Sequence, residues 1–407
     1  MNPSYSPTHA GKFLISQLMI RLKYVVAVCF LLVSAHVSSQ PLRDINFAYL
    51  YNSQEAFTFT MKPIRLARQW SVAYELRLLS DSLRTEDFEI HWETRHSLMD
   101  KEAVTHGVAT NYKKLANSIH GAVTVALEAA PKLLVARVVR ISLKRAWIFY
   151  KRLPENYPVD NYLESDGKIL TTSFIHAGDS VTAGANDRNV VSYYRQDFPA
   201  ALPTFSERVG RVSPAIRPDS TFSVSFGEAM KLYATGLYLV QRDTTATEGL
   251  SFRVEADYPR MSKVESLVGP MVYICTKQEY DRLVLAKGEK RTFDRVILNI
   301  TNDTERARTL IRSYFRRVEL ANQYFTSYKE GWKTDRGMVM IVYGAPDEVF
   351  KFDDREVWTY KDYGNTTTFN FARSSSLFDP ENYVLIRDEK YRLGWYETID
   401  LWRSARF

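Results

Sequence analysis

The residues of this chain whose types and spacing could do chemistry are few. His91-Trp-Glu-Thr-Arg-His96 contains two histidines, but two metal ligands share a helical face in the different spacing His-Glu-x-x-His. On a strand, His91 and His96 point to opposite faces. Asp353 and Asp354 are adjacent and precede Arg355, a pattern that fits a solvated turn better than two carboxylates acting on a glycosidic bond. We therefore predict neither a metal site nor a catalytic carboxylate pair.

Cys275 is the remaining candidate nucleophile, at an expected step from a strand to a helix. A helix N-terminus can lower the pKa of a thiol, yet a lone cysteine is more often a buried core residue. The chain also lacks a Gly-x-Ser-x-Gly elbow, a phosphate-binding Walker loop and a dinucleotide-binding fingerprint. We predict no catalytic residue and no cofactor.

The first 39 residues have the pattern of a targeting signal. Arg21 and Lys23 precede an apolar run over residues 24–33, and small residues follow as far as Ser39. A basic region, a short apolar run and a small-residue cleavage region are typical of a secretory signal peptide. The run is too short to span a membrane. We predict a signal peptide over residues 1–39, with Met19 as a candidate start and cleavage after Ser39 or Ala35.

The predicted signal places the mature chain outside the cytosol: periplasmic, associated with the outer membrane, or secreted. Small residues followed by Gln at the cleavage region are similar to signals of Bacteroidota. Hydrophobic residues at 45% and charged residues at 25% are ordinary for 407 residues of globular chain. Removing three positive charges with the signal reduces the formal charge from +7 to +4. We predict no nucleic-acid partner and no membrane span in the mature chain.

The elements of the first two thirds have the period of strands. Alternating or β-branched runs occur at Trp70–Leu78, Asp87–Thr94, Val123–Glu128, Leu133–Leu143, Lys168–Ile175, Val190–Tyr194, Leu232–Val240 and Leu250–Tyr258. The last two predict a hairpin, and a helix over residues 133–150 stays open as an alternative. Two prolines at Pro154 and Pro158 indicate a linker. We predict two all-β, sandwich-like (Ig-like) modules over residues 40–155 and 156–262.

The C-terminal third has the signals of an α+β domain over residues 263–407. Thr276 and Glu279 form a predicted capping box, and Asn302 or Asp303 can cap a longer helix that runs to about Lys329. Gly331 is placed to end that helix in a left-handed turn. Short strands are predicted beyond it, at Met338–Tyr343, Val357–Tyr360, Thr366–Phe371 and Tyr383–Ile386.

One segment of this domain carries a family resemblance. Gly331-Trp-Lys-Thr-Asp-Arg-Gly337, followed by Tyr343-Gly-Ala-Pro-Asp-Glu348, resembles the signature of the GWxTD domain family, bacterial envelope-associated proteins of uncharacterised biochemical role. The resemblance covers residues 269–407, and Ala345 stands where the family more often has a second proline. The signature and possible binding residues are Gly331, Trp332, Thr334, Asp335, Arg336, Gly337, Gly344, Pro346, Asp347, Glu348, Trp358 and Tyr360.

The chemistry of the signature indicates a joint between a helix and a sheet. Thr334 and Asp335 can accept hydrogen bonds from nearby backbone amides, and Arg336 can pair with Asp335, Asp347 or Glu348. The alternative is a notch for a peptide or a sugar, lined by Trp332, Trp358 and Tyr360.

We predict an exported, non-enzymatic envelope protein that acts as an interaction or structural module, with an envelope protein or a glycan as its partner. The alternative function is an exported hydrolase or carbohydrate-binding protein that uses the surface of Trp332 and Trp358.

Overall fold

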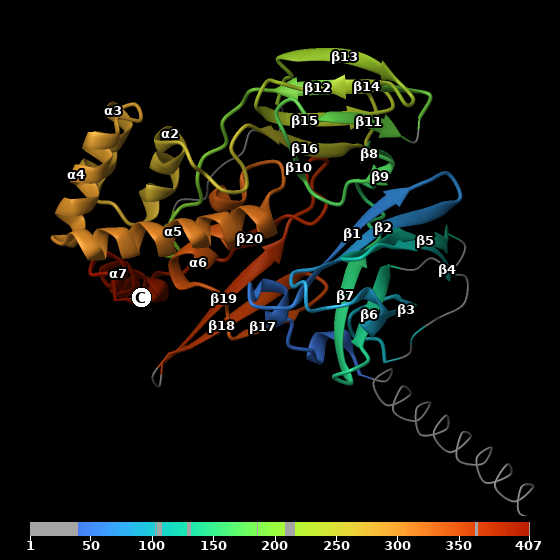
Figure 1. Ribbon diagram of the computed structural model, residues 1–407, viewed down its shortest axis with the longest axis horizontal. Coiled ribbons are helices and arrows are strands. Elements are labelled where there is room, and N and C mark those ends of the chain that lie inside the picture. Colours follow the sequence, from blue (N-terminus) through green and yellow to red (C-terminus); the bar gives the residue numbers. More distant parts are fainter. Residues whose placement is uncertain are drawn as a thin grey trace, which may run out of the picture.

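The computed structural model describes residues 40–101, 103, 108–127, 132–184, 186–207, 216–362 and 365–406. Residues 1–39, on which the predicted signal peptide falls, lie outside the described residues. Figure 1 shows three parts: strands β1 to β7, strands β8 to β16, and a C-terminal region of helices and a sheet. The N-terminal half thus consists of several largely antiparallel sheets, and the C-terminal region combines helices with one sheet.

Two antiparallel sheets form the first part. One has the strand order β1-β2-β5-β4 and the other β3-β6-β7. Their strands are β1 (Phe57–Arg65), β2 (Gln69–Leu78), β3 (Phe88–Arg95), β4 (Val108–Lys114), β5 (Ser118–Ala126), β6 (Leu133–Arg140) and β7 (Arg145–Arg152), with the 3-10 helix η3 (Thr85–Asp87) before β3. Side chains of both sheets meet in one core that contains Trp70, Val72, Phe88 and Val138. Residues 133–150 therefore form strands, and the helix alternative is wrong.

The second part also has two sheets, in the orders β10-β16-β15-β12-β13 and β14-β11-β8-β9. Their strands are β8 (Tyr162–Ser165), β9 (Lys168–Ile169), β10 (Phe174–His176), β11 (Ser180–Gly184), β12 (Arg188–Tyr194), β13 (Ser220–Ser225), β14 (Ala229–Lys231), β15 (Gly236–Gln241) and β16 (Leu250–Glu255). The predicted hairpin is confirmed, because β15 and β16 pair antiparallel. The single strand expected over residues 168–175 is instead β9 and β10, in different sheets.

The C-terminal region packs helices against the sheet β17-β18-β19-β20. Its helices are α2 (Val264–Val268), η5 (Gly269–Tyr273), α3 (Lys277–Leu285), α4 (Lys290–Thr301), α5 (Thr304–Phe325), η6 (Gly331–Lys333), α6 (Asp335–Tyr343), η7 (Glu389–Tyr391) and α7 (Arg392–Arg403), and its strands are β17 (Glu348–Lys351), β18 (Arg355–Asp362), β19 (Asn365–Arg373) and β20 (Tyr383–Leu385). The capping box of Thr276 and Glu279 is confirmed in both of its hydrogen bonds. Asp303, and not Asn302, caps α5.

Two predictions about this region are wrong. Residues 338–343 belong to helix α6 and not to a strand, because Thr334 caps a helix whose next residues pack on α5. Helix α5 ends at Phe325, short of Lys329. In addition, the amphipathic helix α7 was not predicted, although it buries Trp395, Ile399 and Trp402.

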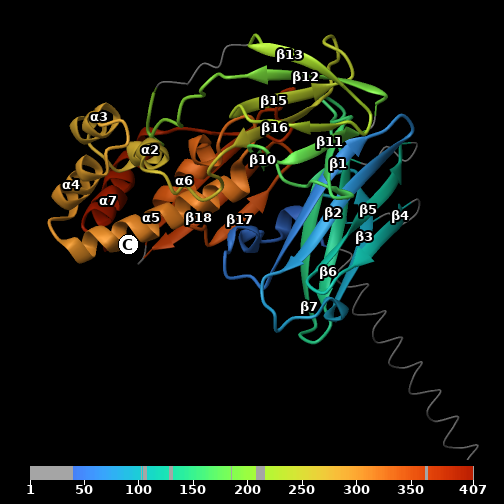
Figure 2. The same cartoon turned by 45° about the horizontal axis from the view of Figure 1, so that its top comes forward.

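A short N-terminal segment completes the C-terminal core. The 3-10 helices η1 (Leu42–Asp44) and η2 (Ala48–Tyr51) precede the first β-rich part in sequence, yet Leu42, Phe47 and Tyr51 are buried with the side chains of the C-terminal region. The backbone amide of Phe47 donates to the carbonyl of Val349 at 2.8 Å. Figure 2 shows this segment beside β17. The C-terminal region therefore depends on residues about 300 positions upstream.

Candidate functional site

The predicted signature forms a tight connection between α5 and α6. Gly331–Lys333 make the 3-10 helix η6, and Thr334 then caps α6 by accepting a hydrogen bond from the Gly337 amide at 3.0 Å. The Thr334 hydroxyl also donates to the Gly331 carbonyl at 2.8 Å. Thr334 thus satisfies backbone groups on both sides of the bend, as the local chemistry predicted.

Two glycines of the signature, Gly331 and Gly337, allow backbones to come close together. A Cβ atom on Gly331 would lie 2.1 Å from the Ala321 carbonyl oxygen of α5, and one on Gly337 would lie 1.9 Å from the Gly331 carbonyl oxygen. The positive-φ glycines include Gly344 but not Gly331. The predicted left-handed turn at Gly331 is therefore wrong, and glycine is needed there because α5 leaves no room for a side chain.

Trp332 is held in the core by its backbone and its ring. Its amide donates to the Asn322 side chain at 3.0 Å, and its carbonyl accepts from the Tyr273 hydroxyl at 2.8 Å. The indole meets Tyr273 edge to face and leaves no space for a Cβ on Gly269. Only 7% of the residue is exposed.

Asp335 joins α6 to the strand β20. Its carboxylate accepts from the Leu385 amide at 2.7 Å and from the Arg387 guanidinium at 2.6 Å. Asp335 therefore does bind a backbone amide, but that amide lies 50 residues away and not in the next turn. The interaction fixes the helix to the sheet, which is the joint that the sequence predicted.

Arg336 binds a partner that the sequence analysis did not name. Its guanidinium pairs with Glu356 of β18 at 3.3 Å and stacks on Tyr383 at 4.4 Å. The predicted pairing with Asp335, Asp347 or Glu348 is wrong. Asp335 forms its ion pair with Arg387. Lys361 binds the other two carboxylates: its backbone amide donates to Asp347, and its ammonium group donates to Glu348. The turn beyond α6 is bound to strand β18, because the Gly344 carbonyl accepts a hydrogen bond from the Tyr360 hydroxyl. Pro346 in the same turn is buried.

Glu356 is the centre of this buried network and is fully shielded from solvent. It accepts from the Tyr51 hydroxyl at 2.6 Å and from the Trp358 indole at 2.7 Å, and Lys351 lies 3.7 Å away. Burial disfavours its charge, but Lys351 and Arg336 outweigh burial and hold the pKa of Glu356 below its ordinary value. Alternate residues of a strand share one face, so Glu356 lies on the same side of β18 as Trp358 and Tyr360. A carboxylate on this core-facing side was the sequence signal for the network.

The aromatic residues of the signature do not line an open notch. Trp358 is 0% exposed, Trp332 is in the core, and the Tyr360 hydroxyl is bound to Gly344. The predicted notch lined by these three rings, and a binding surface made by Trp332 and Trp358, are therefore wrong. Strand register and helix packing turn both indoles inward.

Arg336 instead faces a cavity of about 200 Å³ where the three parts of the chain meet. Residues of β1, β7, β16, α5 and the segment after β19 line this junction cavity. Its charged residues are Lys62, Lys151, Arg152, Arg336, Asp379 and Glu381. Lys151 pairs with Glu381, and Arg152 donates to the Phe352 carbonyl at 2.7 Å. Lys62 forms no ion pair or hydrogen bond through its ammonium with the described residues.

Thr334→Ala is expected to lower the free energy of unfolding by about 1 to 2 kcal/mol, because α6 loses its N-cap. Thr334→Ser keeps the hydroxyl oxygen and should recover most of the loss. Denaturant unfolding of the two variants measures the difference. Equal stability of the alanine and serine variants would contradict the capping role.

Lys62→Met is expected to stabilise the protein at neutral pH by about 2 kcal/mol. Burial, with Lys151 nearby, lowers the pKa of Lys62 to about 8, whereas an unfolded lysine titrates at about 10.4. Between these values the unfolded state binds more protons, so the wild type gains stability as pH rises. The advantage of Lys62→Met should therefore shrink from about pH 8 to pH 10 in denaturant unfolding. Lys113→Met, on the exposed strand β4, is the control; a destabilised Lys62→Met would contradict the prediction.

The other candidate residues are not assembled into a site. Cys275 is largely buried, which raises the pKa of its thiol to about 12 and keeps it protonated. His91 and His96 are exposed, and Asp353 and Asp354 lie in the exposed turn between β17 and β18. Within the described ranges, no group of three or more His, Cys, Asp or Glu residues could hold a metal ion.

No helix in the described part of the chain is both long and apolar enough to cross a membrane. The longest, α5, carries charged residues along its exposed face.

The fold is that of a protein in which β-rich parts precede a mixed α/β region. The signature forms the tight connection between helices α5 and α6 of that region. Residues 236–404 match the sequence model of one protein family, the GWxTD domain. This part of the chain is a GWxTD domain. The match begins at β15, and the structure ties β16 to the signature: Arg253 pairs with Glu330 at 3.3 Å, and the Gly331 amide donates to Tyr258. No curated protein matches the chain.

Proposed function

We propose that this chain is an exported, non-enzymatic protein of a bacterial cell envelope, in which the GWxTD domain binds another envelope component. The proposal includes two sandwich-like (Ig-like) β modules, and strands β15 and β16 of the second module fall within the GWxTD match. The observation that carries it is how the signature is used: Thr334, Asp335 and Arg336 each hold another element of the domain through a hydrogen bond or an ion pair. Internal contacts of this kind support a structural role for the signature, as a scaffold for the domain.

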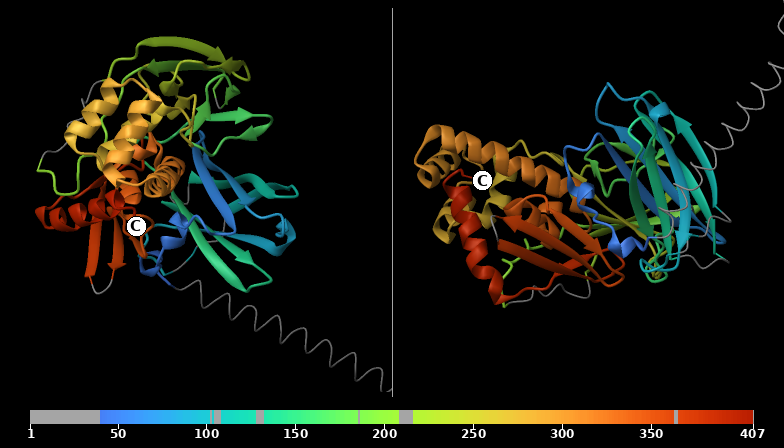
Figure 3. Two further views of the ribbon diagram at one scale, coloured as in Figure 1. Left: turned by 60° about the vertical axis from the view of Figure 1, so that its left-hand side comes forward. Right: turned by 90° about the horizontal axis from the view of Figure 1, so that it is seen from below.

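The outer helices of the domain support a binding role. Large apolar side chains are exposed on α3, α4 and α7, at the end of the molecule farthest from β1 to β7 (Figure 3). They are Val284, Leu285, Leu298, Leu393, Tyr396 and Leu401. Leu285 is 80% exposed and Leu393 is 71% exposed. Exposed apolar groups of this kind favour contact with a partner protein.

Site-specific photocrosslinking in the producing cell tests the partner. A photoreactive residue at Leu285 or Leu393 should give one reproducible adduct, whereas Tyr233, equally exposed at 71% on the second β-rich part, should not. Adducts at Tyr233 alone, or at none of the three positions, would contradict binding through the GWxTD domain. N-terminal sequencing of the protein from the envelope fraction tests export: the chain should begin at Gln40 or His36, and an intact residue 1 or 19 in the cytosol would contradict it.

The alternative of an enzyme that acts at Trp332 and Trp358 has no support, because neither ring reaches the surface. A glycosidase acting at these two rings would also need accessible carboxylates beside them, and Glu356 is buried and bound to Tyr51 and Trp358.

A further inference from the structure

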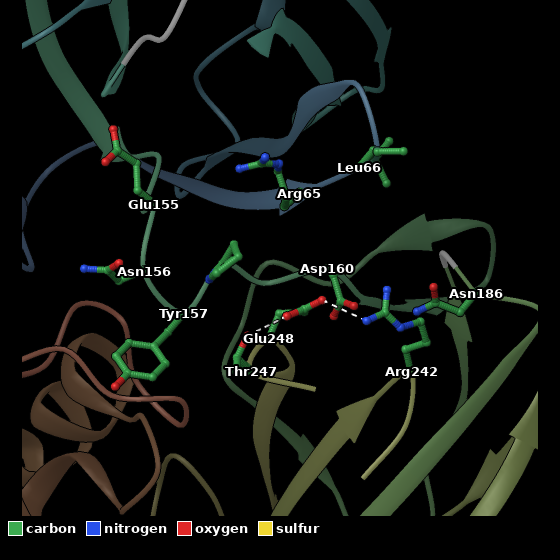
Figure 4. Close-up of a pocket in the computed structure, with 12 residues that line it drawn as sticks. Arg65, Leu66, Glu155, Asn156, Tyr157, Asp160, Asn186, Arg242, Thr247 and Glu248 are labelled. Carbon is green, nitrogen blue, oxygen red and sulfur yellow. Dashed lines mark hydrogen bonds and ion pairs between the residues drawn. The ribbon is translucent and has the colours of Figure 1, made fainter. Parts of the chain in front are cut away.

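A second and larger hollow lies between the two β-rich parts, away from the signature. Its volume is about 820 Å³, within the range of pockets that bind small molecules. Three segments build it: the turn after β1, the linker between β7 and β8, and the loops at the end of the second part (Figure 4). Side chains from all three segments surround the same space, so the pocket exists only when both β-rich parts are in place.

One carboxylate oxygen in this pocket is not satisfied by its neighbours. The Oδ1 atom of Asp160 is buried and accepts no hydrogen bond from another described residue. Burial and the nearby Glu248 raise the pKa of Asp160. Figure 4 shows Asp160 among the lining side chains, beside Glu248 and Arg242, which a dashed line joins. A buried acceptor without a donor is costly, so a ligand that supplies a donor is favoured at this point.

The rest of the lining offers donors. Arg65 forms no ion pair with the described residues, and the Asn156 and Asn186 amides lie around the same space. Arg242 donates to Glu248 at 3.3 Å. The guanidinium groups of Arg65 and Arg242 would repel a simple cation, and the carboxylates of Asp160 and Glu248 would repel a simple anion. The lining therefore favours neither kind of ion. Planar side chains that alternate donors with acceptors instead match the neighbouring hydroxyl groups of a sugar, each of which both donates and accepts.

We propose that this pocket binds a saccharide, with Asp160 accepting from one hydroxyl group and Arg65 donating to another. The volume holds a short oligosaccharide. The proposal deepens the proposed function, since an exported chain meets envelope glycans. Binding to the purified protein does not depend on export, so failure of this proposal and failure of the proposed location would be distinguishable.

The test uses the purified chain from residue 40 onward, with cellotriose, maltotriose and triacetylchitotriose as probes. Saturation-transfer NMR at millimolar sugar identifies the binder, and calorimetry gives its affinity. At least one probe should bind, and Asp160→Asn should weaken it about tenfold at neutral pH. Asp81→Asn, an exposed aspartate in the loop after β2, should bind like the wild type. Circular dichroism checks that each variant is folded.

A pH series separates contact with the sugar from a structural role of Asp160. The wild type should lose affinity as the pH falls from 7 through the raised pKa of Asp160, because protonation removes the carboxylate acceptor, whereas Asp160→Asn should show a flat profile. The groups that face Asp160 are Glu248, Asp243 and Arg242, and all three are unchanged in the variant. Absence of binding by all three sugars, or an unchanged affinity in Asp160→Asn, would overturn the proposal.

Discussion

Glu356→Gln is expected to lower the free energy of unfolding by about 3 to 5 kcal/mol, the range measured when one member of a buried ion pair is removed. The substitution keeps the shape of the side chain, and its amide oxygen can still accept from Tyr51 or Trp358. It removes the only negative charge within 4 Å of the buried Arg336 and Lys351 among the described residues. Arg336 and Lys351, whose side chains are only 18% and 13% exposed, would then lose the carboxylate that pairs with both of them.

Denaturant unfolding of Glu356→Gln measures this loss, with Glu89→Gln as the matched control. Glu89 also lies on a strand, but its side chain is 52% exposed, so its substitution should change stability little. The pKa of Glu356 is lowered in the folded protein, so its stabilising effect is present above about pH 4.3 and is lost as the pH falls. The variant should therefore lose less stability in acid than the wild type. Wild-type-like stability at neutral pH would contradict the buried network.

Gly331→Ala is expected to destabilise the protein by about 3 kcal/mol or more, the upper end for an overpacked core. The added methyl group would lie 2.1 Å from the Ala321 carbonyl oxygen and 2.6 Å from the Asn322 Cα atom. Both atoms are backbone of α5 and cannot rotate away. The connection would have to shift, which would break the hydrogen bond from the Trp332 amide to Asn322.

Gly394→Ala is the control for this prediction. Gly394 lies within helix α7, and a Cβ there would meet nothing within 4 Å. The substitution should stabilise the protein by about 0.5 to 1 kcal/mol, because alanine is the better helix former. Thermal unfolding of the two variants should shift the melting temperature in opposite directions. A Gly331→Ala protein as stable as Gly394→Ala would show that the close approach is not needed.

Local patterns predicted the elements whose signals lie within a few residues. The capping box at Thr276 and the hairpin of β15 and β16 follow from neighbouring side chains and alternation, and the structure confirms them. The N-cap was predicted at Asn302 or Asp303, and the structure places it at Asp303. The prediction of a strand over residues 338–343 was wrong, because Met, Val and Ile in succession suit a buried helix as well as a strand. Only the packing of α6 against α5 decides between them.

In the signature, too, the local chemistry was predictable and the distant partners were not. Its residue types predicted a joint between a helix and a sheet, with Thr334 and Asp335 as hydrogen-bond acceptors. The partners of Asp335 and Arg336 lie 52 and 20 residues away, in Arg387 and Glu356. The Tyr51 hydroxyl reaches Glu356 across 305 residues of sequence.

Residue types and short spacings were enough to predict the family of the C-terminal domain, the β-rich character of the first half and the absence of familiar catalytic motifs. Tertiary structure alone decided that Trp332 and Trp358 are core residues, that Glu356 neutralises Arg336, and that the two hollows lie where separate parts of the chain meet. The physical reason is that burial and ion pairing depend on distances in space, which register and packing set after the local elements have formed.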